Sequence, residues 1–471
     1  MNLKFLTFSV IFLLFFQISN LKANNLQLGI PTVTTSNKLV FTVSWDNSWN
    51  TTSAPNNWDG VYLFAKYRNC ASTGAWEHVT FSTTLADLTT GSPLEVDSYN
   101  LDGKGVVVKR KNTGSGNITN VTVTLEMTAP NDGASYDFKV FGIEMVFIPT
   151  GDFYLGDGVS YYSFKDGGSG AANTPLHVTS DGSLTRGTSA GNIYSTSAGT
   201  VPTSIPASFP LGYDSVYVMK YEITQGQIVS FLNTLASDQA TKFLGYNSYR
   251  INRAGSWPNY TTVYPHRAVG YLSWQNIAAY LDWSALRPMT ETEYEKICRG
   301  PIYPVTYEHA WGSNLIEDVT AITTDGTVTE KNTNIAVPGK GKANYGNNGI
   351  KGPMRSGFAS SPTSNRLEAG ASYYGVMEMT GNAHEFCVGV YSASGRSFTR
   401  ATGDGYLTLA PNGGNSNEAN WPALTAGSAG VTARGGSSGH AIAQVYLSNR
   451  YYYNYTIAAS KYYYNGGRGL R

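Results

Sequence analysis

The chain has 471 residues and a formal net charge of +1, with 51 glycines, 33 tyrosines and only 14% charged residues. Because so small a net charge gives no strong electrostatic field, we exclude nucleic acid and acidic membrane surfaces as partners. The composition is typical of turn-rich extracellular proteins, and tyrosine suits recognition because it offers a large contact area at low entropic cost.

Residues 1–23 predict a secretory signal peptide. Lys4 precedes an apolar run from Phe5 to Phe16, and a small-residue cleavage point follows Ala23. The run is shorter than the about 20 apolar residues that cross a bilayer. No cysteine stands near the cleavage point to carry a lipoprotein anchor. We therefore expect a secreted protein, periplasmic or extracellular at the cell surface, without a direct membrane span.

Residues 24–140 predict an antiparallel β-sandwich of the immunoglobulin or fibronectin kind. Short runs of β-branched and aromatic residues are separated by clusters of Gly, Asn, Asp and Ser, and no helical periodicity interrupts them. These runs are Lys38–Trp45, Gly60–Tyr67, Val106–Lys111 and Asn120–Glu126. Because this region contains no catalytic constellation, we interpret it as a spacer or interaction module.

Residues 141–471 predict a second, loop-rich domain, which makes the whole chain α+β. A strand, a turn and a strand are expected over Phe147–Gly156. The stretch at about 157–205 is rich in Gly, Ser and Thr, and we expect it to be a loop or an insertion.

Three helices are predicted in this domain, each beginning at a hydroxyl residue that can cap it. The caps are Thr224, Ser273 and Thr290. At the third helix, Thr290 and Glu293 have the spacing of a capping box.

The three cysteines, Cys70, Cys298 and Cys387, allow at most one disulfide within the chain. No Cys-x-x-Cys pair or Cys/His cluster with zinc spacing is present. We interpret each cysteine as a buried, inert thiol.

Seven motifs occur in an order that resembles the formylglycine-generating enzyme (sulfatase-modifying-factor) family. Each motif is weak alone, but together they extend over about 140–471. They are Phe147–Phe153 (family W-I-P-G-G-x-F), Tyr217–Thr224 (K-Y-E-V-T), Val269–Trp274 (V-x-x-V-S-W), Arg287–Glu295 (R-L-P-T-E-A-E-W-E), Gly375–Phe386 (G-L-Y-D-M-x-G-N-V-W-E-W), Arg434–Ser437 (R-G-G-S) and Gly467–Arg471 (G-F-R).

The resemblance implies a C-type-lectin-like fold and, in many members, a calcium ion. The positions that match the family's calcium ligands are Glu378, the carbonyls of Gly381 and Ala383, and Glu385. Calcium prefers such a mixture of carboxylate and carbonyl oxygens. The alternative is that Glu385 and Asn382 only hold the turn together.

Enzymatic members of the family bind copper through two cysteines shortly after R-G-G-S. The matching positions here are His440 and Val445. Because valine cannot bind a metal and a single imidazole is a poor Cu(I) ligand, we expect no copper site and no formylglycine-forming activity. A second branch binds iron with a His-rich site, but the six histidines of this chain are scattered singly.

The last stretch of the chain is rich in tyrosine and predicts a recognition surface. The resemblance implies that this stretch, about 438–466, matches the variable ligand-binding face of lectin-like proteins of the diversity-generating kind. The alternative is that about half of these rings point inward as core. The candidate ligand-binding residues are His440, Tyr446, Arg450, Tyr452, Tyr455, Tyr462 and Tyr464.

We therefore interpret the chain as a non-catalytic secreted protein that binds a protein or a glycan at the cell surface, as an adhesin or as a subunit of a larger extracellular complex. Two alternatives stay open. One is a calcium-dependent glycan-binding lectin. The other is a metal-dependent oxidase with a non-standard ligand set, for which His440, His384 and Glu385 are the residues to suspect.

Overall fold

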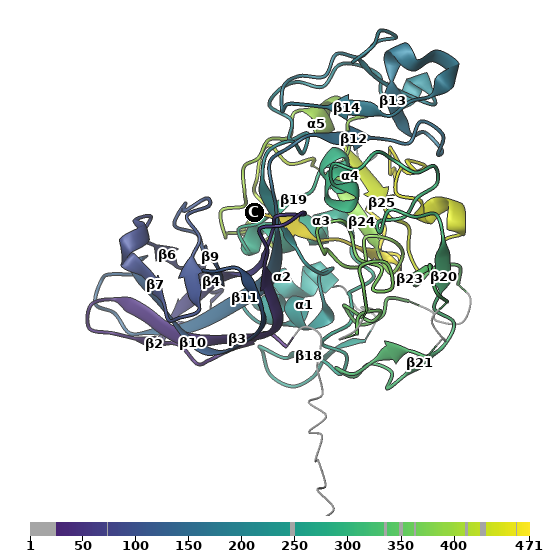
Figure 1. Cartoon of the computed structure of the whole chain (residues 1–471). Helices are drawn as coiled ribbons and strands as arrows, with labels where there is room; N and C mark the ends of the chain where they lie inside the picture. Colours follow the sequence, from purple (N-terminus) through teal and green to yellow (C-terminus); the bar gives the residue numbers. More distant parts are fainter. Residues whose placement is uncertain are drawn as a thin grey trace, which may run out of the picture.

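The computed structural model describes residues 25–72, 74–244, 250–333, 337–347, 352–361, 364–409, 413–423, 430–457 and 459–471. The signal peptide predicted at 1–23 lies outside these residues. Short and medium strands dominate, with few helices, so the fold is α+β and rich in β-structure (Figure 1). Within the described ranges, every helix is too short or too polar to cross a membrane.

The strands and helices have the following bounds. The first strands are β1 (Gln27–Leu28), β2 (Thr32–Val33), β3 (Lys38–Asn50), β4 (Asp59–Asn69), β5 (Glu77–His78), β6 (Thr80–Phe81), β7 (Leu88–Thr90), β8 (Leu94–Val96), β9 (Val106–Arg110), β10 (Gly114–Ala129), β11 (Tyr136–Ile148), β12 (Phe153–Leu155), β13 (Phe164–Asp166), β14 (Leu176–Val178), β15 (Ile193–Ser195) and β16 (Val216–Met219). The later strands are β17 (Ile251–Arg253), β18 (Tyr260–Thr262), β19 (Arg287–Pro288), β20 (Ile316–Asp318), β21 (Ile322–Thr323), β22 (Lys331–Asn332), β23 (Gly341–Ala343), β24 (His384–Val388), β25 (Val431–Arg434), β26 (Asn465–Gly466) and β27 (Gly469–Leu470). The α-helices are α1 (Gln225–Leu232), α2 (Ser237–Leu244), α3 (Trp274–Trp283), α4 (Glu291–Arg299) and α5 (Ala393–Arg396).

Two antiparallel sheets form the first part of the chain. One has the order β1-β3-β10-β6, with β2 and β7 on its edges, and the other has the order β19-β27-β16-β11-β4-β9-β8, with β5 beside β4. The four strands predicted before residue 140 are all present and lie within β3, β4, β9 and β10. Side chains from these strands alternate inward into one apolar cluster between the two sheets, which includes Leu39, Phe41, Leu63, Val108 and Val123.

One strand, β11, joins the first part of the chain to the rest. It pairs with β4 from Tyr136 to Val146 and with β16 from Met145 to Ile148. The second sheet therefore continues past residue 140 into the following region, where β27 and β19 extend it.

The three predicted helices are confirmed, and each has the predicted cap. Thr224, Ser273 and Thr290 accept hydrogen bonds at the N-termini of α1, α3 and α4, and all three ends form capping boxes. The short helices α2 and α5 were not predicted. The stretch 157–205, expected to be loop, also contains the short strands β13, β14 and β15 (Figure 1).

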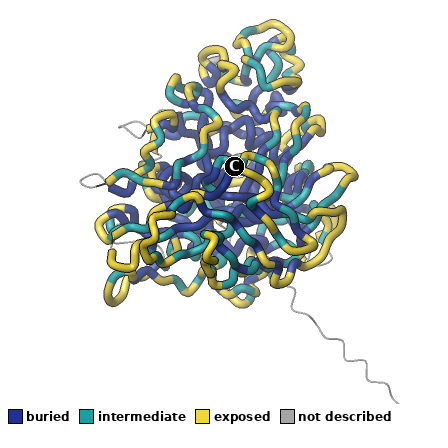
Figure 2. Tube along the Cα trace, turned by 90° about the vertical axis from the view of Figure 1, so that its left-hand side faces the viewer, coloured by how far each residue is buried: buried dark blue, intermediate teal, exposed yellow. Residues whose placement is uncertain are grey.

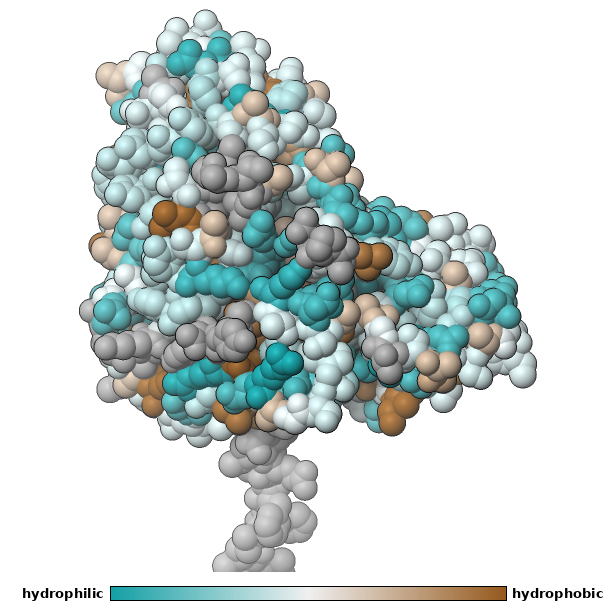
Figure 3. Space-filling view, turned by 180° about the vertical axis from the view of Figure 1, so that it is seen from behind, coloured by the Kyte–Doolittle hydropathy of each residue, from teal (hydrophilic) through white to brown (hydrophobic). Residues whose placement is uncertain are grey.

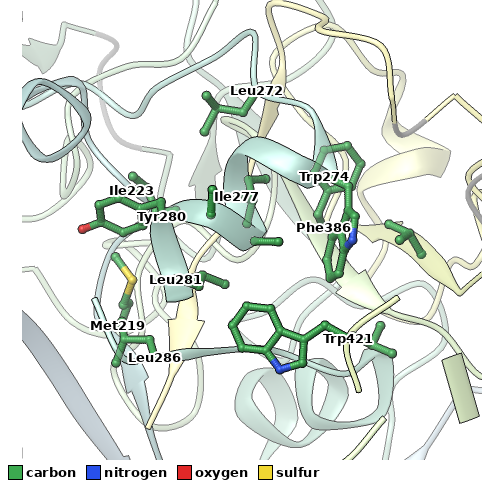
Figure 4. Packing of buried hydrophobic residues seen from close by; sticks show 14 of the residues in the cluster. Met219, Ile223, Leu272, Trp274, Ile277, Tyr280, Leu281, Leu286, Phe386 and Trp421 are labelled. Carbon is green, nitrogen blue, oxygen red and sulfur yellow. The ribbon is translucent and has the colours of Figure 1, made fainter. Parts of the chain in front are cut away.

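The largest apolar core surrounds α3. Ile277, Tyr280 and Leu281 on this helix pack against Met219, Phe386 and other side chains from distant parts of the chain (Figure 4). Buried segments run through the centre of the molecule, and exposed residues gather on the outer loops (Figure 2). On the face seen from behind, hydrophobic residues form small separate patches within a mainly hydrophilic surface (Figure 3).

Candidate functional site

Strand β24 places two predicted site residues on opposite faces of a small sheet. It pairs antiparallel with β25 and parallel with β26, so that Glu385 lies opposite Arg434 and Gly466. Successive side chains of a strand point to opposite faces. His384 therefore points away from Glu385, and the three residues suspected for a metal-dependent oxidase do not converge on one point.

The rings of His384 and His440 are stacked on each other. Their centroids are 4.2 Å apart and their planes differ by 23°. His384 is fully buried, and neither of its ring nitrogens has a hydrogen-bond partner among the described residues. A buried polar group without a partner costs about 1–3 kcal/mol, so an unpaired imidazole is uncommon and calls for an explanation.

Both imidazoles are neutral near pH 7. Burial, and then the neighbouring His440, hold the pKa of His384 well below its usual value. Burial lowers the pKa of His440 to about 4.

Both ring nitrogens of His440 have hydrogen-bond partners. Nε2 lies 3.1 Å from the Tyr452 hydroxyl, which also accepts a hydrogen bond of 3.0 Å from Gln444. Nδ1 shares a hydrogen bond with the Ser437 hydroxyl. A hydroxyl can donate or accept, so both nitrogens are satisfied in either neutral tautomer.

Tyrosines surround this histidine pair. The Tyr452 ring meets His384 edge-on with centroids 5.0 Å apart, and the Tyr464 ring meets His440 at 4.9 Å. Tyr455 is buried, its ring lies 5.2 Å from that of Tyr452, and its hydroxyl donates to Asn465. Tyr462 stacks on Tyr464 and is 37% exposed.

The ring contacts continue outward into a larger surface. Tyr451 touches Tyr452 on one side and Tyr161 on the other, with centroids 4.9 and 5.5 Å apart. Tyr161 and Tyr451 are about half exposed. Two further contacts, of Tyr162 with Tyr453 and of Tyr453 with Tyr391, extend the row. We use the name tyrosine face for Tyr161, Tyr162, Tyr391, Tyr451, Tyr452, Tyr453, Tyr462 and Tyr464. Tyr463 borders it through a contact with Tyr464, and the buried Tyr455 lies against Tyr452.

Two predicted ligand-binding residues lie apart from the tyrosine face. Arg450 is fully buried, forms an ion pair with Glu291 and lies over the ring of Phe164. Tyr446 packs against Tyr307 and His309. Conversely, the predicted ligand-binding residues did not include Tyr451 and Tyr453, although both lie within the tyrosine-rich stretch 438–466. Tyr161, Tyr162 and Tyr391 were missed altogether, and the available signal was the Tyr161-Tyr162 pair inside the predicted insertion.

The second position that matches the family's copper-binding cysteines is part of the core. Val445 is fully buried in a small apolar cluster with Trp311. Cys298 and Cys387 are buried free thiols, and burial raises the pKa of Cys298 to about 12. Cys70 is also free, but it is exposed, whereas we expected a buried thiol.

On the other face of β24, three buried carboxylates surround one arginine. Arg468 binds Glu385 at 2.6 Å and also donates to the carbonyl of Met377. Glu378 accepts a hydrogen bond from the Gly357 amide, and burial raises its pKa to about 7. Glu222 is the third carboxylate.

The predicted calcium ligands are close to this group. One oxygen each of Glu378 and Glu385, Oε2 in both, is buried without a hydrogen-bond partner among the described residues. Three carboxylates outnumber the two guanidiniums that act on them, Arg468 and Arg355, so the group has an excess of negative charge when ionised. Free carboxylate oxygens and excess negative charge both suit a hard cation such as calcium.

The turn that carries Gly381 and Ala383 is held by the protein itself. Glu222 accepts hydrogen bonds from the Asn382 side chain and from the Ala383 amide, the latter at 2.8 Å. The Asn382 side chain also accepts from the Met354 amide. Asn382 therefore has the turn-fixing role named as the alternative to a metal ligand, whereas Glu378 and Glu385 each keep an oxygen free.

A separate acidic trio was not predicted. Ligand atoms of Asp282, Asp404 and Glu418 all lie within 4.8 Å of one another. The Asp282 carboxylate, however, accepts hydrogen bonds from Asp404, Ser416 and Asn417. Its oxygens are thus occupied in fastening a loop to the end of α3.

The comparison with protein families agrees with the motif order. A family model described as the sulfatase-modifying factor enzyme 1-like domain matches residues 139–461. No curated protein matches the sequence. Among solved structures, the chain is similar to Treponema denticola variable protein 1, with 13% identity, a TM-score of 0.34, and coverage of 70% of this chain and 95% of that one.

Proposed function

We propose that this chain, which belongs to the sulfatase-modifying factor enzyme 1-like family, is a non-catalytic binding protein secreted to the bacterial cell surface. In this proposal residues 1–23 direct export, 24–140 form a β-sandwich module, and 141–471 form a C-type-lectin-like domain with an insertion at about 157–205. The partner is a protein or a glycan, and the chain is an adhesin or a subunit of an extracellular complex.

The observation that carries the proposal is the tyrosine face above the stacked histidines. Its rings come from separate segments of the chain, and several are exposed. Exposed, mutually packed tyrosines present a rigid surface that loses little conformational entropy on binding. The neutral imidazole of His384 lies buried beneath this surface without hydrogen-bond partners among the described residues.

The absence of enzymatic function is supported by the chemistry at the family's copper position. His440 uses both ring nitrogens in hydrogen bonds, and Val445 has no ligand atom. Elemental mass spectrometry of the purified mature protein tests this directly. Calcium alone or no metal agrees with a binding protein, whereas stoichiometric copper or iron would contradict it and make His440 the first residue to mutate.

The binding role is tested on bacterial cell-envelope preparations and on a glycan array. The double variant Tyr161→Ala, Tyr451→Ala removes the two most exposed rings of the tyrosine face. Tyr303→Ala is the matched control, because Tyr303 is 56% exposed and lies outside the face. We expect at least tenfold weaker binding by the double variant and unchanged binding by the control; equal binding by all three proteins refutes the role of the face.

A calcium-dependent lectin is the second candidate, supported by the free oxygens of Glu378 and Glu385. In this case calcium is held by these two carboxylates and the carbonyls of Gly381 and Ala383. Glycan binding that disappears in EGTA and in Glu378→Gln favours the lectin. Glycan binding that survives both favours recognition by the tyrosine rings alone.

A further inference from the structure

A groove separate from the tyrosine face lies between β11 and α1. Its volume is about 420 Å³, which is within the range of about 300–1,000 Å³ typical of ligand sites. Residues 140–144 of β11 form one wall, and Gly226, Gln227 and Ser230 of α1 line the opposite side. Aromatic side chains, including Phe141 and Trp283, also line it.

The wall formed by β11 is an open strand edge. β4 pairs with β11 from Tyr136 to Val146, but β16 pairs with its other side only from Met145 onward. One residue before Met145, the Glu144 carbonyl still accepts a hydrogen bond from the Lys220 amide, which follows β16 in the chain. Residues 136–143 therefore have a ladder partner on one side only.

The direction of the free backbone groups follows from the alternation of an antiparallel ladder, in which every second residue points its N–H and C=O to the same side. Glu144 points its carbonyl toward the β16 side, so Val140 and Gly142 point theirs to that side as well. Among the described residues, no group donates to or accepts from the backbone of Val140 or Gly142. Both residues are only partly buried and line the groove.

The end of the groove at Glu144 is acidic, and because burial raises the pKa of this carboxyl to about 7, a cation beside it would favour its ionised form. Its Oε1 is buried without a hydrogen-bond partner and lies 3.9 Å from the ammonium of Lys220. Lys220 is shared with Asp59 at 3.5 Å. Two carboxylates thus face one lysine. Arg355 also lines the groove, but its guanidinium donates to the backbone carbonyls of Glu330, Ser356 and Gly357. A basic side chain next to Glu144 would therefore balance the charge.

We propose that this groove receives an extended peptide segment of a partner protein, which adds as a strand to β11 at Val140 and Gly142 and places a basic side chain near Glu144. The free N–H and C=O groups supply the main-chain hydrogen bonds of strand addition, and the aromatic lining receives apolar side chains at alternate positions. An unpaired strand edge is otherwise a liability that proteins cover or charge.

The test selects short linear peptides from a phage-displayed random library on the mature wild-type protein. Val140→Pro is the edge variant, because proline removes the N–H that faces the groove and leaves the bonds to β4 intact. Val140→Thr is its matched control, since threonine keeps the N–H and the β-branched shape. Glu144→Gln tests the charged end, and thermal unfolding verifies that each variant is folded.

We expect peptides rich in Lys or Arg that bind the wild type and Val140→Thr equally, Val140→Pro at least tenfold more weakly, and Glu144→Gln several-fold more weakly. A measurement on the peptide itself does not depend on how the variants fold. Two versions of the peptide are N-methylated, one at its odd-numbered amides and the other at its even-numbered amides. One version should lose binding and the other should bind unchanged, because only every second amide faces β11.

Amide hydrogen exchange adds a site-specific readout. The Val140 and Gly142 amides should gain protection when peptide binds, whereas the Phe141 amide, which already faces β4, should not. The proposal is overturned if every selected peptide binds Val140→Pro and Val140→Thr with equal affinity. It is also overturned if the two N-methylated peptides bind the wild type equally well. Self-association of the wild type that Val140→Pro abolishes would overturn it in favour of a second copy of this chain.

Discussion

Replacing Arg450 by methionine should destabilise the protein strongly, although this arginine was predicted to bind a ligand. Its guanidinium makes two hydrogen bonds to the Glu291 carboxylate, at 2.7 and 3.0 Å, and both side chains are fully buried. Burial raises the pKa of Glu291, but Arg450 and then Arg434 reverse this and hold it below its usual value. The carboxylate is therefore ionised and depends on its arginines.

The expected loss is about 3–5 kcal/mol, the range for breaking a buried ion pair by removing one partner. The lower end is favoured because Glu291 keeps Arg434 at 3.1 Å and the Val390 amide at 2.9 Å. Loss of the contact between the guanidinium and the Phe164 ring, whose centre is 3.8 Å away, adds to the destabilisation.

The assay is urea-induced unfolding followed by intrinsic fluorescence, which gives the free energy of unfolding for each variant. Arg186→Met is the matched control, because Arg186 also lies over an aromatic ring, that of Tyr194, but is exposed; it should cost less than about 1 kcal/mol. Arg450→Lys, which keeps the charge but not the two-pronged contact, should be intermediate. A loss below about 1 kcal/mol for Arg450→Met would refute the reasoning.

Three further predictions concern the carboxylates, the histidines and the tyrosine face. Burial raises the pKa of Glu378 from 4.5 to about 7, so its contribution to stability is present below pH 4.5 and is lost as the pH rises through 7. Calcium binds the ionised carboxylate, which forms over the same range. The increase in Tm caused by calcium should therefore grow from pH 4.5 to above pH 7 and should vanish in Glu378→Gln. A calcium effect of equal size at pH 5 and pH 8 would contradict this. Because burial lowers the pKa of His440 from 6.5 to about 4, its contribution is present above pH 6.5 and is lost as the pH falls toward 4; His440→Gln should reduce the acid dependence of Tm, and an unchanged profile would count against it. Tyr462→Ala should weaken partner binding by about three- to tenfold without changing Tm by more than about 2 °C, since this ring is partly exposed; a similar effect of Tyr406→Ala, an exposed tyrosine elsewhere, would show that the loss is not specific.

Local features of the fold were predictable because their causes are local in sequence. A hydroxyl residue just before an apolar periodic run marks the start of a helix, so Thr224, Ser273 and Thr290 could be identified as caps. The spacing of Thr290 and Glu293 also predicted the capping box there, whereas the boxes at Thr224 and Ser273 were not predicted. The alternation of β-branched residues likewise identified the runs in β3 and β4. The short strand β14, in contrast, pairs only with β12, and a stretch rich in Gly, Ser and Thr gives no periodic signal for such a pairing.

The candidate site was predictable only in part, because it depends on contacts between distant segments. His440 and Tyr452 were identified from the region after R-G-G-S, but the stacking of His384 on His440 depends on how β24 lies beside β25 and β26. Arg450 has the sequence context of the tyrosine-rich stretch, yet its partner Glu291 is 159 residues away. No pattern near Arg450 could have shown that it points inward.

The continuity of β11 gives the molecule a definite mechanical character. A flexible linker would let two parts of a surface protein swing independently, but here a single strand is bonded to β4 along one stretch and to β16 along the next. A pull on the first sheets would be carried into the region of α1 and α3 by a ladder of backbone hydrogen bonds. The first sheets and the tyrosine face would therefore keep a fixed orientation to each other under force. The backbone hydrogen bonds of β11 to β4 and β16 would be the first interactions to resist a load, because the force would shear them.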